Sequence, residues 1–202
     1  QLARVVPDFH AVLTLPEAPA VIAVDVPIGL LATASAGGRA SSVFSAPTRA
    51  ALAAFRAGSG YQAVSTANRG GVATSPGLSQ QTFGILPKID EVDAALSSTS
   101  QGVVREVHPE LCFAEANAGT PMTHSKKTTA GRTERVTLLG SLGFVAPLQL
   151  LGAKLPKGAK SDDLLDACIA CWTAERVAAG SALVAPTTPP TDSRGLRMEL
   201  WR

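Results

Sequence analysis

The feature that most constrains this chain is a run of mostly branched apolar residues, Ala20–Val26, that carries one acid, Asp25. Such a run is typical of a strand buried on both faces of an α/β sheet. Pro27 and Gly29 then end the strand, because proline lacks a ladder amide and glycine favours turns. A carboxylate among apolar neighbours needs a metal, an arginine or backbone amides as its partner. Asp25 is therefore a candidate functional residue, and a turn residue that accepts backbone hydrogen bonds is the alternative.

Strands and helices alternate along the rest of the chain, which predicts a single α/β domain over residues 1–202. The apolar pattern and the positions of proline and glycine predict further strands at residues 2–6, 103–107 and 196–201. Helices are expected at residues 7–13, 47–55, 61–68, 78–96, 110–117, 131–142 and 161–179. We expect the small and polar residues 31–42 to form a loop.

Composition narrows the class of protein. The chain has 18 Lys and Arg against 16 Asp and Glu, a net charge of +2, so nucleic acid could be bound only through a local patch. No apolar stretch approaches the length of about 18 residues that a membrane span needs. The three cysteines fit no zinc pattern, and we expect Cys168 and Cys171 to be small apolar core residues. Free cysteines, and a start at Gln1 without a basic-then-apolar leader, favour a cytoplasmic protein.

A second set of candidates follows the strand predicted at residues 103–107. Alternation along a strand puts Glu106 and His108 on one face and Val107 on the other. Pro109 then starts a turn or helix that leaves Glu110 near its N-terminus. Two carboxylates and an imidazole this close together suit a divalent cation or acid–base chemistry. A helix-capping Glu110 and a hydrogen-bonded His108 are the structural alternatives.

A basic stretch precedes the helix expected at residues 131–142. It contains Ser125, Lys126, Lys127 and Thr128, and Arg132 follows shortly after. Hydroxyl and cationic groups before a helix resemble an anion-binding site, because the amides and the dipole of the helix add to the side-chain charge. The glycines of a P-loop are absent. A solvated basic turn is the alternative.

Acids also cluster at the start of the helix expected at residues 161–179. Ser161 is a good N-cap, and Asp162 and Asp163 fall in the first turn, where the helix dipole favours carboxylates. Asp163 and Asp166 are three residues apart and therefore share a helix face. Like charges this close repel unless a cation lies between them. These acids are thus candidate metal ligands, and capping acids are the alternative.

Several blocks, taken in order along nearly the whole chain, resemble one known family, domain of unknown function 429. The blocks are Val24–Leu30, Ser42–Pro47, Leu86–Asp93, Glu106–Glu110, Ser125–Thr128, Gly131–Arg132, Asp162–Ala167 and Gly195–Glu199. The family is described as predicted nucleases with a ribonuclease H-like fold. The resemblance implies a mixed sheet flanked by helices. It also implies that this chain begins after the family's first strand and hairpin, so that its N-terminus is incomplete.

The resemblance further implies a metal-dependent nuclease that hydrolyses DNA or RNA with two Mg²⁺ or Mn²⁺ ions held between acids. The implied metal ligands are Asp25, Glu106, Asp163 and Asp166. His108 and Glu110 would join them in the catalytic site. The implied phosphate-binding residues are Ser125, Lys126, Lys127 and Arg132.

Two other functions remain open at this point. One is a phosphotransferase of the related sugar-kinase and actin-like superfamily, suggested by the basic stretch at residues 125–132. The other is a non-catalytic binding or assembly protein that keeps the fold, consistent with the low net charge. The apolar strand expected near Trp201 would be a liability as an exposed edge, so we expect it to pair within the sheet or across a homodimer.

Overall fold

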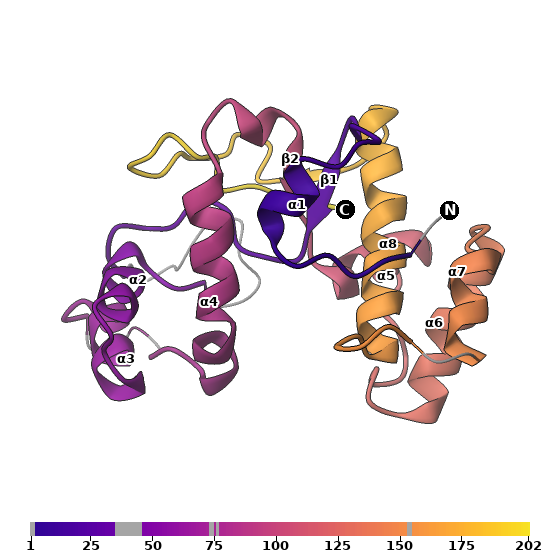
Figure 1. Cartoon of the computed structure of the whole chain (residues 1–202), viewed down its shortest axis with the longest axis horizontal. Coiled ribbons are helices and arrows are strands. Elements are labelled where there is room, and N and C mark those ends of the chain that lie inside the picture. Colours follow the sequence, from indigo (N-terminus) through magenta and orange to yellow (C-terminus); the bar gives the residue numbers. More distant parts are fainter. Residues whose placement is uncertain (1–2, 35–45, 73–74, 76, 153–154) are drawn as a thin grey trace. The chain divides into compact units, whose positions relative to one another are not determined.

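The computed structural model describes residues 3–34, 46–72, 75, 77–152 and 155–202, and it shows a mixed α/β protein of helices and short strands (Figure 1). The α/β class predicted from the sequence is therefore confirmed. Contacts between residues divide the chain into two compact units. Unit 1 comprises residues 1–25, 107–183 and 201–202, and unit 2 comprises residues 26–106 and 184–200.

Unit 1 is built around α8 (Ser161–Ala178). The other regular elements of this unit are α1 (Phe9–Leu13), β1 (Ile22–Val24), α5 (Pro109–Ala116), α6 (Thr129–Ser141), α7 (Val145–Gln149) and the 3₁₀ helix η2 (Leu150–Gly152). Helix α8 packs against β1, α5, α6 and α7. Phe113, Leu139 and Ile169 are fully buried in the core between these elements. Burial of such side chains stabilises the packing by about 1.5–3 kcal/mol each.

Backbone pairing sets three segments of unit 1 side by side. The amide of Val107 donates to the carbonyl of Val24 at 2.9 Å. Val107 also forms a parallel bridge with Trp201. Asp25 and His108 each directly follow a residue of this ladder. The pairing therefore fixes where Asp25 and His108 lie relative to each other along the backbone.

In unit 2, helices α2 (Arg49–Arg56), α3 (Tyr61–Arg69) and α4 (Gln80–Ala95) lie together (Figure 1) and enclose a second apolar core. Helix α2 packs against α3 and α4. The buried side chains of this core include Leu30, Leu52, Val64, Leu86 and Ile89. The short 3₁₀ helix η1 (Ser100–Gly102) leads into β2 (Val104–Glu106). Strand β3 (Val184–Ala185) pairs with β4 (Leu200–Trp201).

A network of ion pairs around a buried carboxylate connects α2, α4 and the C-terminal segment of unit 2. The carboxylate of Asp93 is 4% exposed and meets three guanidinium groups, those of Arg49 at 3.1 Å, Arg56 at 3.1 Å and Arg194 at 3.0 Å. Arg49 also pairs with Asp192. A carboxylate so far from water is tolerated because cationic donors surround it.

The predicted helices are all present, with ends shifted by at most two residues. Other expectations differ from the structure. Residues 3–6 form no strand, and the strand expected at 20–26 spans only 22–24, because regular pairing extends no further in the described chain. The C-terminal strand is similarly reduced to 200–201, and α7 was not predicted. Most of the expected loop at 31–42 lies outside the described residues. None of the described helices has the length and apolar character needed to cross a membrane.

The start of α6 depends on a close backbone approach. Thr128 caps the helix, because its hydroxyl accepts a hydrogen bond from the amide of Gly131 at 3.0 Å. Gly131 lies against the preceding loop so closely that an added Cβ would be 2.0 Å from the carbonyl oxygen of Ser125. Only glycine fits at this position without displacing backbone. The loop that carries Lys126 and Lys127 is thereby held against α6.

Gly131→Ala is expected to lower the free energy of unfolding by about 1–3 kcal/mol, because the loop backbone must move to admit the methyl group. Gly140→Ala in the same helix is the matched control. No atom lies within 4 Å of a Cβ added at Gly140, so this variant should be neutral or stabilising by about 0.5–1 kcal/mol. Urea unfolding of both variants measures the difference, and equal effects would contradict the role given to Gly131.

Candidate functional site

Five of the candidate side chains come together in unit 1, and we call them the Lys126 cluster: Asp25, His108, Glu110, Lys126 and Asp166. Asp25 directly follows β1, while His108 and Glu110 lie at the start of α5. Lys126 belongs to the loop before α6, and Asp166 lies in the second turn of α8. Segments far apart in the sequence thus supply one group of charges.

Lys126 interacts electrostatically with each of the other four side chains. Its Nζ donates a hydrogen bond to Asp166 Oδ2 at 2.9 Å. Partial burial opposes the charge of the ammonium, but the hydrogen bond to Asp166 and the negative charges of Asp166, Glu110 and Asp25 outweigh it and raise the pKa of Lys126. Lys126 is therefore a fixed positive charge among carboxylates near neutral pH.

The two aspartates of the cluster are hard to ionise. Asp25 is exposed as a residue, yet desolvation by the surrounding protein and the charge of Asp166 raise the pKa of its carboxyl to about 6, against the opposing charge of Lys126. Burial likewise raises the pKa of Asp166, although the hydrogen bond from Lys126 lowers it. Carboxylates that disfavour one another's charge are typical of sites that hold a cation.

His108 is held mainly in its neutral form. Burial lowers the pKa of this imidazole, and the positive charge of Lys126 acts in the same direction, whereas Glu110 opposes both. A neutral imidazole can accept a proton or act as a ligand. His108 is also the residue that precedes the first turn of α5, where Pro109 occupies the first helical position.

Arg135 holds Glu110 in place and was not predicted from the sequence. Its side chain is 2% exposed and donates from Nη2 to Glu110 Oε2 at 2.6 Å. Nη1 donates to the carbonyls of His124 at 3.0 Å and Gly131 at 2.9 Å, and the guanidinium lies 5.4 Å from the ring centre of Phe113. Helical spacing could have indicated that Arg135 is buried, because it lies four residues after Gly131 and therefore on the buried face of α6.

Two carboxylate oxygens of the cluster accept no hydrogen bond from the described residues: Glu110 Oε1 and Asp166 Oδ1, both buried. Buried acceptors without donors are costly and need a cation, a water or a ligand. Carboxylate oxygens are the ligands that Mg²⁺ and Mn²⁺ prefer. The donor set therefore fits a divalent ion chemically. Within the described residues, however, no three or more His, Cys, Asp or Glu side chains are arranged around a common point.

Two predicted metal ligands have other partners. Glu106 belongs to unit 2, where its buried carboxylate accepts a hydrogen bond from the amide of Ile28 at 2.7 Å. The carboxylate of Asp163 accepts one from the amide of Lys160 at 2.7 Å and so satisfies a backbone donor at the start of α8. Lys160, not Ser161, is the N-cap residue. Asp166 is thus the acid of α8 that reaches the Lys126 cluster.

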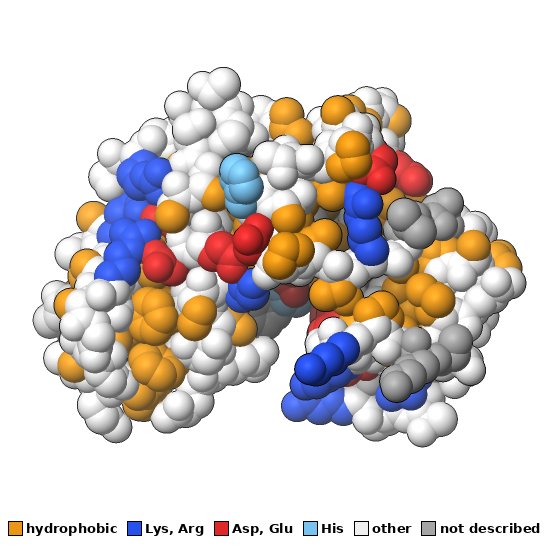
Figure 2. Space-filling model, in the orientation of Figure 1, with side chains coloured by type: hydrophobic (Ala, Val, Ile, Leu, Met, Phe, Trp, Pro, Cys, Tyr) orange, Lys and Arg blue, Asp and Glu red, His pale blue; other side chains and the backbone are white. Residues whose placement is uncertain are grey.

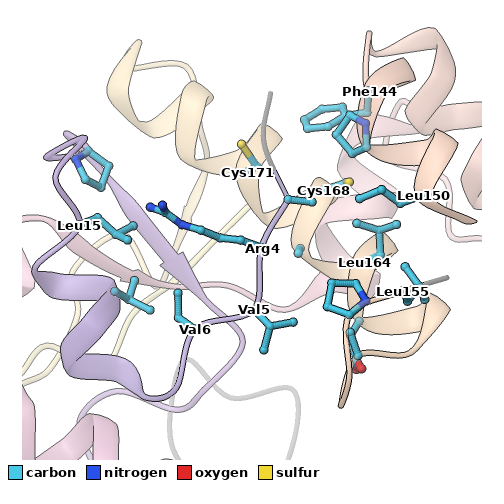
Figure 3. A pocket seen from close by; sticks show the side chains of 18 of the residues that line it. Arg4, Val5, Val6, Leu15, Phe144, Leu150, Leu155, Leu164, Cys168 and Cys171 are labelled. Atoms are coloured by element: carbon cyan, nitrogen blue, oxygen red, sulfur yellow. The ribbon is translucent and has the colours of Figure 1, made fainter. Parts of the chain in front are cut away.

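Asp163 instead borders an apolar cavity of about 620 Å³ in unit 1. Figure 3 shows this cavity between the N-terminal segment, with Val5 and Val6, and the face of α8 that carries Cys168 and Cys171. Cys168 is buried as predicted, whereas Cys171 is exposed. The two faces of α8 therefore differ, since one carries the charged cluster and the other a hydrophobic hollow.

The predicted phosphate-binding loop is ordered by its own hydrogen bonds. The Ser125 carbonyl accepts from the Thr128 amide at 2.9 Å and from its hydroxyl at 2.8 Å. The Glu134 carboxylate accepts from the amide of His124 at 3.0 Å. Lys127 and Arg132 are exposed, unlike the half-buried Lys126. On the face shown in Figure 2, basic and acidic side chains are interspersed. Contacts with phosphate would therefore have to come from small groups of basic residues such as Lys127 and Arg132.

Comparison with known proteins gives a family without an assigned activity. A family model described as "Protein of unknown function (DUF429)" matches residues 2–191. No curated protein and no solved structure matches the chain.

The carboxyl of Asp25 is expected to titrate near pH 6, well above its ordinary value of 3.8. Asp166→Asn removes a like charge and should lower the pKa of Asp25, whereas Lys126→Met removes an opposite charge and should raise it. Because the folded protein binds this proton more tightly than the unfolded chain, Asp25 favours folding at low pH. That contribution is lost as the pH rises from about 4 through about 6.

Carbon-13 NMR of the Asp25 carboxyl across pH 3–8 measures these midpoints, and Glu175→Gln, an exposed change on the same helix as Asp166, serves as the control. A midpoint near 4 that neither cluster variant moves would show that the cluster does not form.

Proposed function

We propose that this chain, which belongs to the DUF429 family of proteins of unknown function, is a divalent-metal-dependent nuclease that hydrolyses phosphodiester bonds of DNA or RNA. The resemblance of the ordered sequence blocks also supports a ribonuclease H-like arrangement of its strands and helices. The side chains of unit 1 support the activity.

One observation carries the proposal: Lys126 pairs with Asp166 at 2.9 Å and is also acted on by the negative charges of acids from two other segments. Asp25, Glu110 and Asp166 all act electrostatically on Lys126, and Glu110 and Asp166 each keep one buried oxygen without a hydrogen bond among the described residues. Folding gathers like charges only where a positive charge compensates them. This arrangement supports a site whose chemistry needs cations next to acids.

Asp25 and Asp166, with Glu110 beside them, would hold the ion. The chemistry that Mg²⁺ or Mn²⁺ supplies in such a site is polarisation of the phosphodiester and a lower pKa for an attacking water. His108, whose pKa is lowered, would accept or hold a proton at its imidazole. Asp163, which was predicted as a ligand, is left to cap α8.

The exposed side chains near the cluster suit a polyanionic substrate. Lys127 lies just before α6 and Arg132 lies in its first turn, and both side chains are exposed. Guanidinium and ammonium groups at a helix start bind phosphate well. They would orient the backbone of a nucleic acid, while the acids of the cluster act on one phosphodiester.

Asp25→Asn and Asp166→Asn are each expected to lower Mn²⁺-dependent cleavage by about 100-fold or more, since loss of a ligand costs at least as much as loss of the residue that orients it. The assay uses fluorescent single-stranded and double-stranded DNA and RNA with purified full chain. Glu175→Gln should cleave at the rate of the unmodified protein, and chelation should abolish cleavage.

Cleavage that persists in both aspartate variants would contradict the assignment of the site. Tight Mn²⁺ binding without cleavage of any of the four substrates would contradict the nuclease and favour a binding protein. Protection against thermal unfolding by ATP, in the absence of cleavage, would favour the phosphotransferase instead.

A further inference from the structure

Lys126 occupies an unusual position for a residue of a basic loop. Its neighbour Lys127 is exposed, but Lys126 is turned inward, with 37% of its side chain accessible and its Nζ 2.9 Å from Asp166 Oδ2. A lysine that served only to contact substrate phosphate would gain from full exposure. The pairing of Lys126 with Asp166 therefore indicates that this lysine has a role within the site.

The backbone on both sides of Lys126 is held firmly. Arg135 donates to the carbonyl of His124 at 3.0 Å, and Glu134 accepts from the amide of the same residue at 3.0 Å. On the other side, the amide of Thr128 bonds to the carbonyl of Ser125 at 2.9 Å. The loop is also pressed against Gly131. The inward direction of the ammonium is thus a built feature and not the result of a loose loop.

The acids around Lys126 already have two cationic side chains as counter-charges. Asp166 pairs with the ammonium of Lys126 at 2.9 Å, the negative charges of Asp25 and Glu110 also act on it, and Glu110 is paired with Arg135 at 2.6 Å. Two cationic groups thus offset three anionic ones. These five side chains carry a net charge of −1, which a bound divalent ion would change to +1. The ion would then lie close to the ammonium of Lys126, which is hydrogen-bonded to Asp166 Oδ2. Such proximity of like charges is strongly unfavourable away from bulk water.

We infer that Lys126 is an exchangeable counter-ion, which holds the carboxylates together until a divalent cation displaces it from Asp166. The displaced side chain has a flexible four-carbon stem and lies on the same loop as Lys127. It would swing outward and join Lys127 and Arg132 on a substrate phosphate. Metal binding would then also prepare the phosphate contact, so that the two events favour each other. This inference rests on the proposed function, because it needs the divalent site.

The first test is Mn²⁺ titration calorimetry on the full chain. Lys126→Met keeps the length and apolar stem of the side chain but removes its charge, so we expect Mn²⁺ to bind about 5-fold or more tightly than in the unmodified protein. Lys157→Met, at an exposed lysine of unit 1 outside the cluster, is the matched control and should leave the affinity unchanged. Circular dichroism confirms that both variants are folded.

The outcomes separate the inference from the proposed function. Equal or weaker Mn²⁺ binding by Lys126→Met than by the unmodified protein would overturn the exchange while leaving the metal site intact. An absence of binding in both proteins would overturn the metal site of the proposed function and the exchange with it. Binding by Lys126→Met alone would support the exchange in its strongest form.

A second test needs no variant. Acetylation of lysines by an N-hydroxysuccinimide ester, followed by mass spectrometry, measures how available each amine is. Addition of Mg²⁺ is expected to raise the acetylation rate of Lys126 several-fold relative to that of Lys127, which serves as the internal standard. Bound Mg²⁺ with an unchanged Lys126 rate would show that the ammonium stays at Asp166, and would overturn the inference.

Discussion

The arrangement of the candidate site depends on the ion pair between Lys126 and Asp166. This contact joins the loop before α6 to α8, the helix around which unit 1 is built. A second ion pair, between Arg135 and Glu110, joins α6 to α5. Together they link α5, α6 and α8, the elements whose charged groups act with Asp25. The attraction of two cationic side chains offsets the repulsion that these acids would otherwise experience, so the charges of the site and the packing of unit 1 are mutually dependent.

The helices could be predicted because their signals are local. Helix α8 has an N-terminal run of acids and an apolar face, and Gly180 after it adopts a positive φ of 70°, as expected of a glycine that ends a helix. The strands were less predictable, since an apolar run does not say how much of it finds a partner. β1 pairs over fewer residues than its composition suggests. The short helix α7 contains Pro147 and gave no clear periodic signal, so its formation depends on tertiary packing.

The candidate site was partly accessible to sequence reasoning. Asp25 stood out as an acid in an apolar strand, and the acids of α8 stood out by their spacing. Spacing alone could not decide between Asp163 and Asp166, because the choice depends on a side chain turning back to the amide of Lys160. Arg135 was missed because a charged residue on a helix is usually exposed. Its role becomes clear only when Glu110 is brought against it from another helix.

The central claim is that the acids of the Lys126 cluster form a cation site in which the ammonium and a divalent ion are alternatives. The most direct measurement is the anomalous scattering of crystals of this protein grown with Mn²⁺. We predict a manganese peak at the carboxylates of Asp25 and Asp166, with Lys126 Nζ no longer bonded to Asp166. Crystals that show no peak at the cluster, with the ion pair of Lys126 and Asp166 intact in millimolar Mn²⁺, would contradict it.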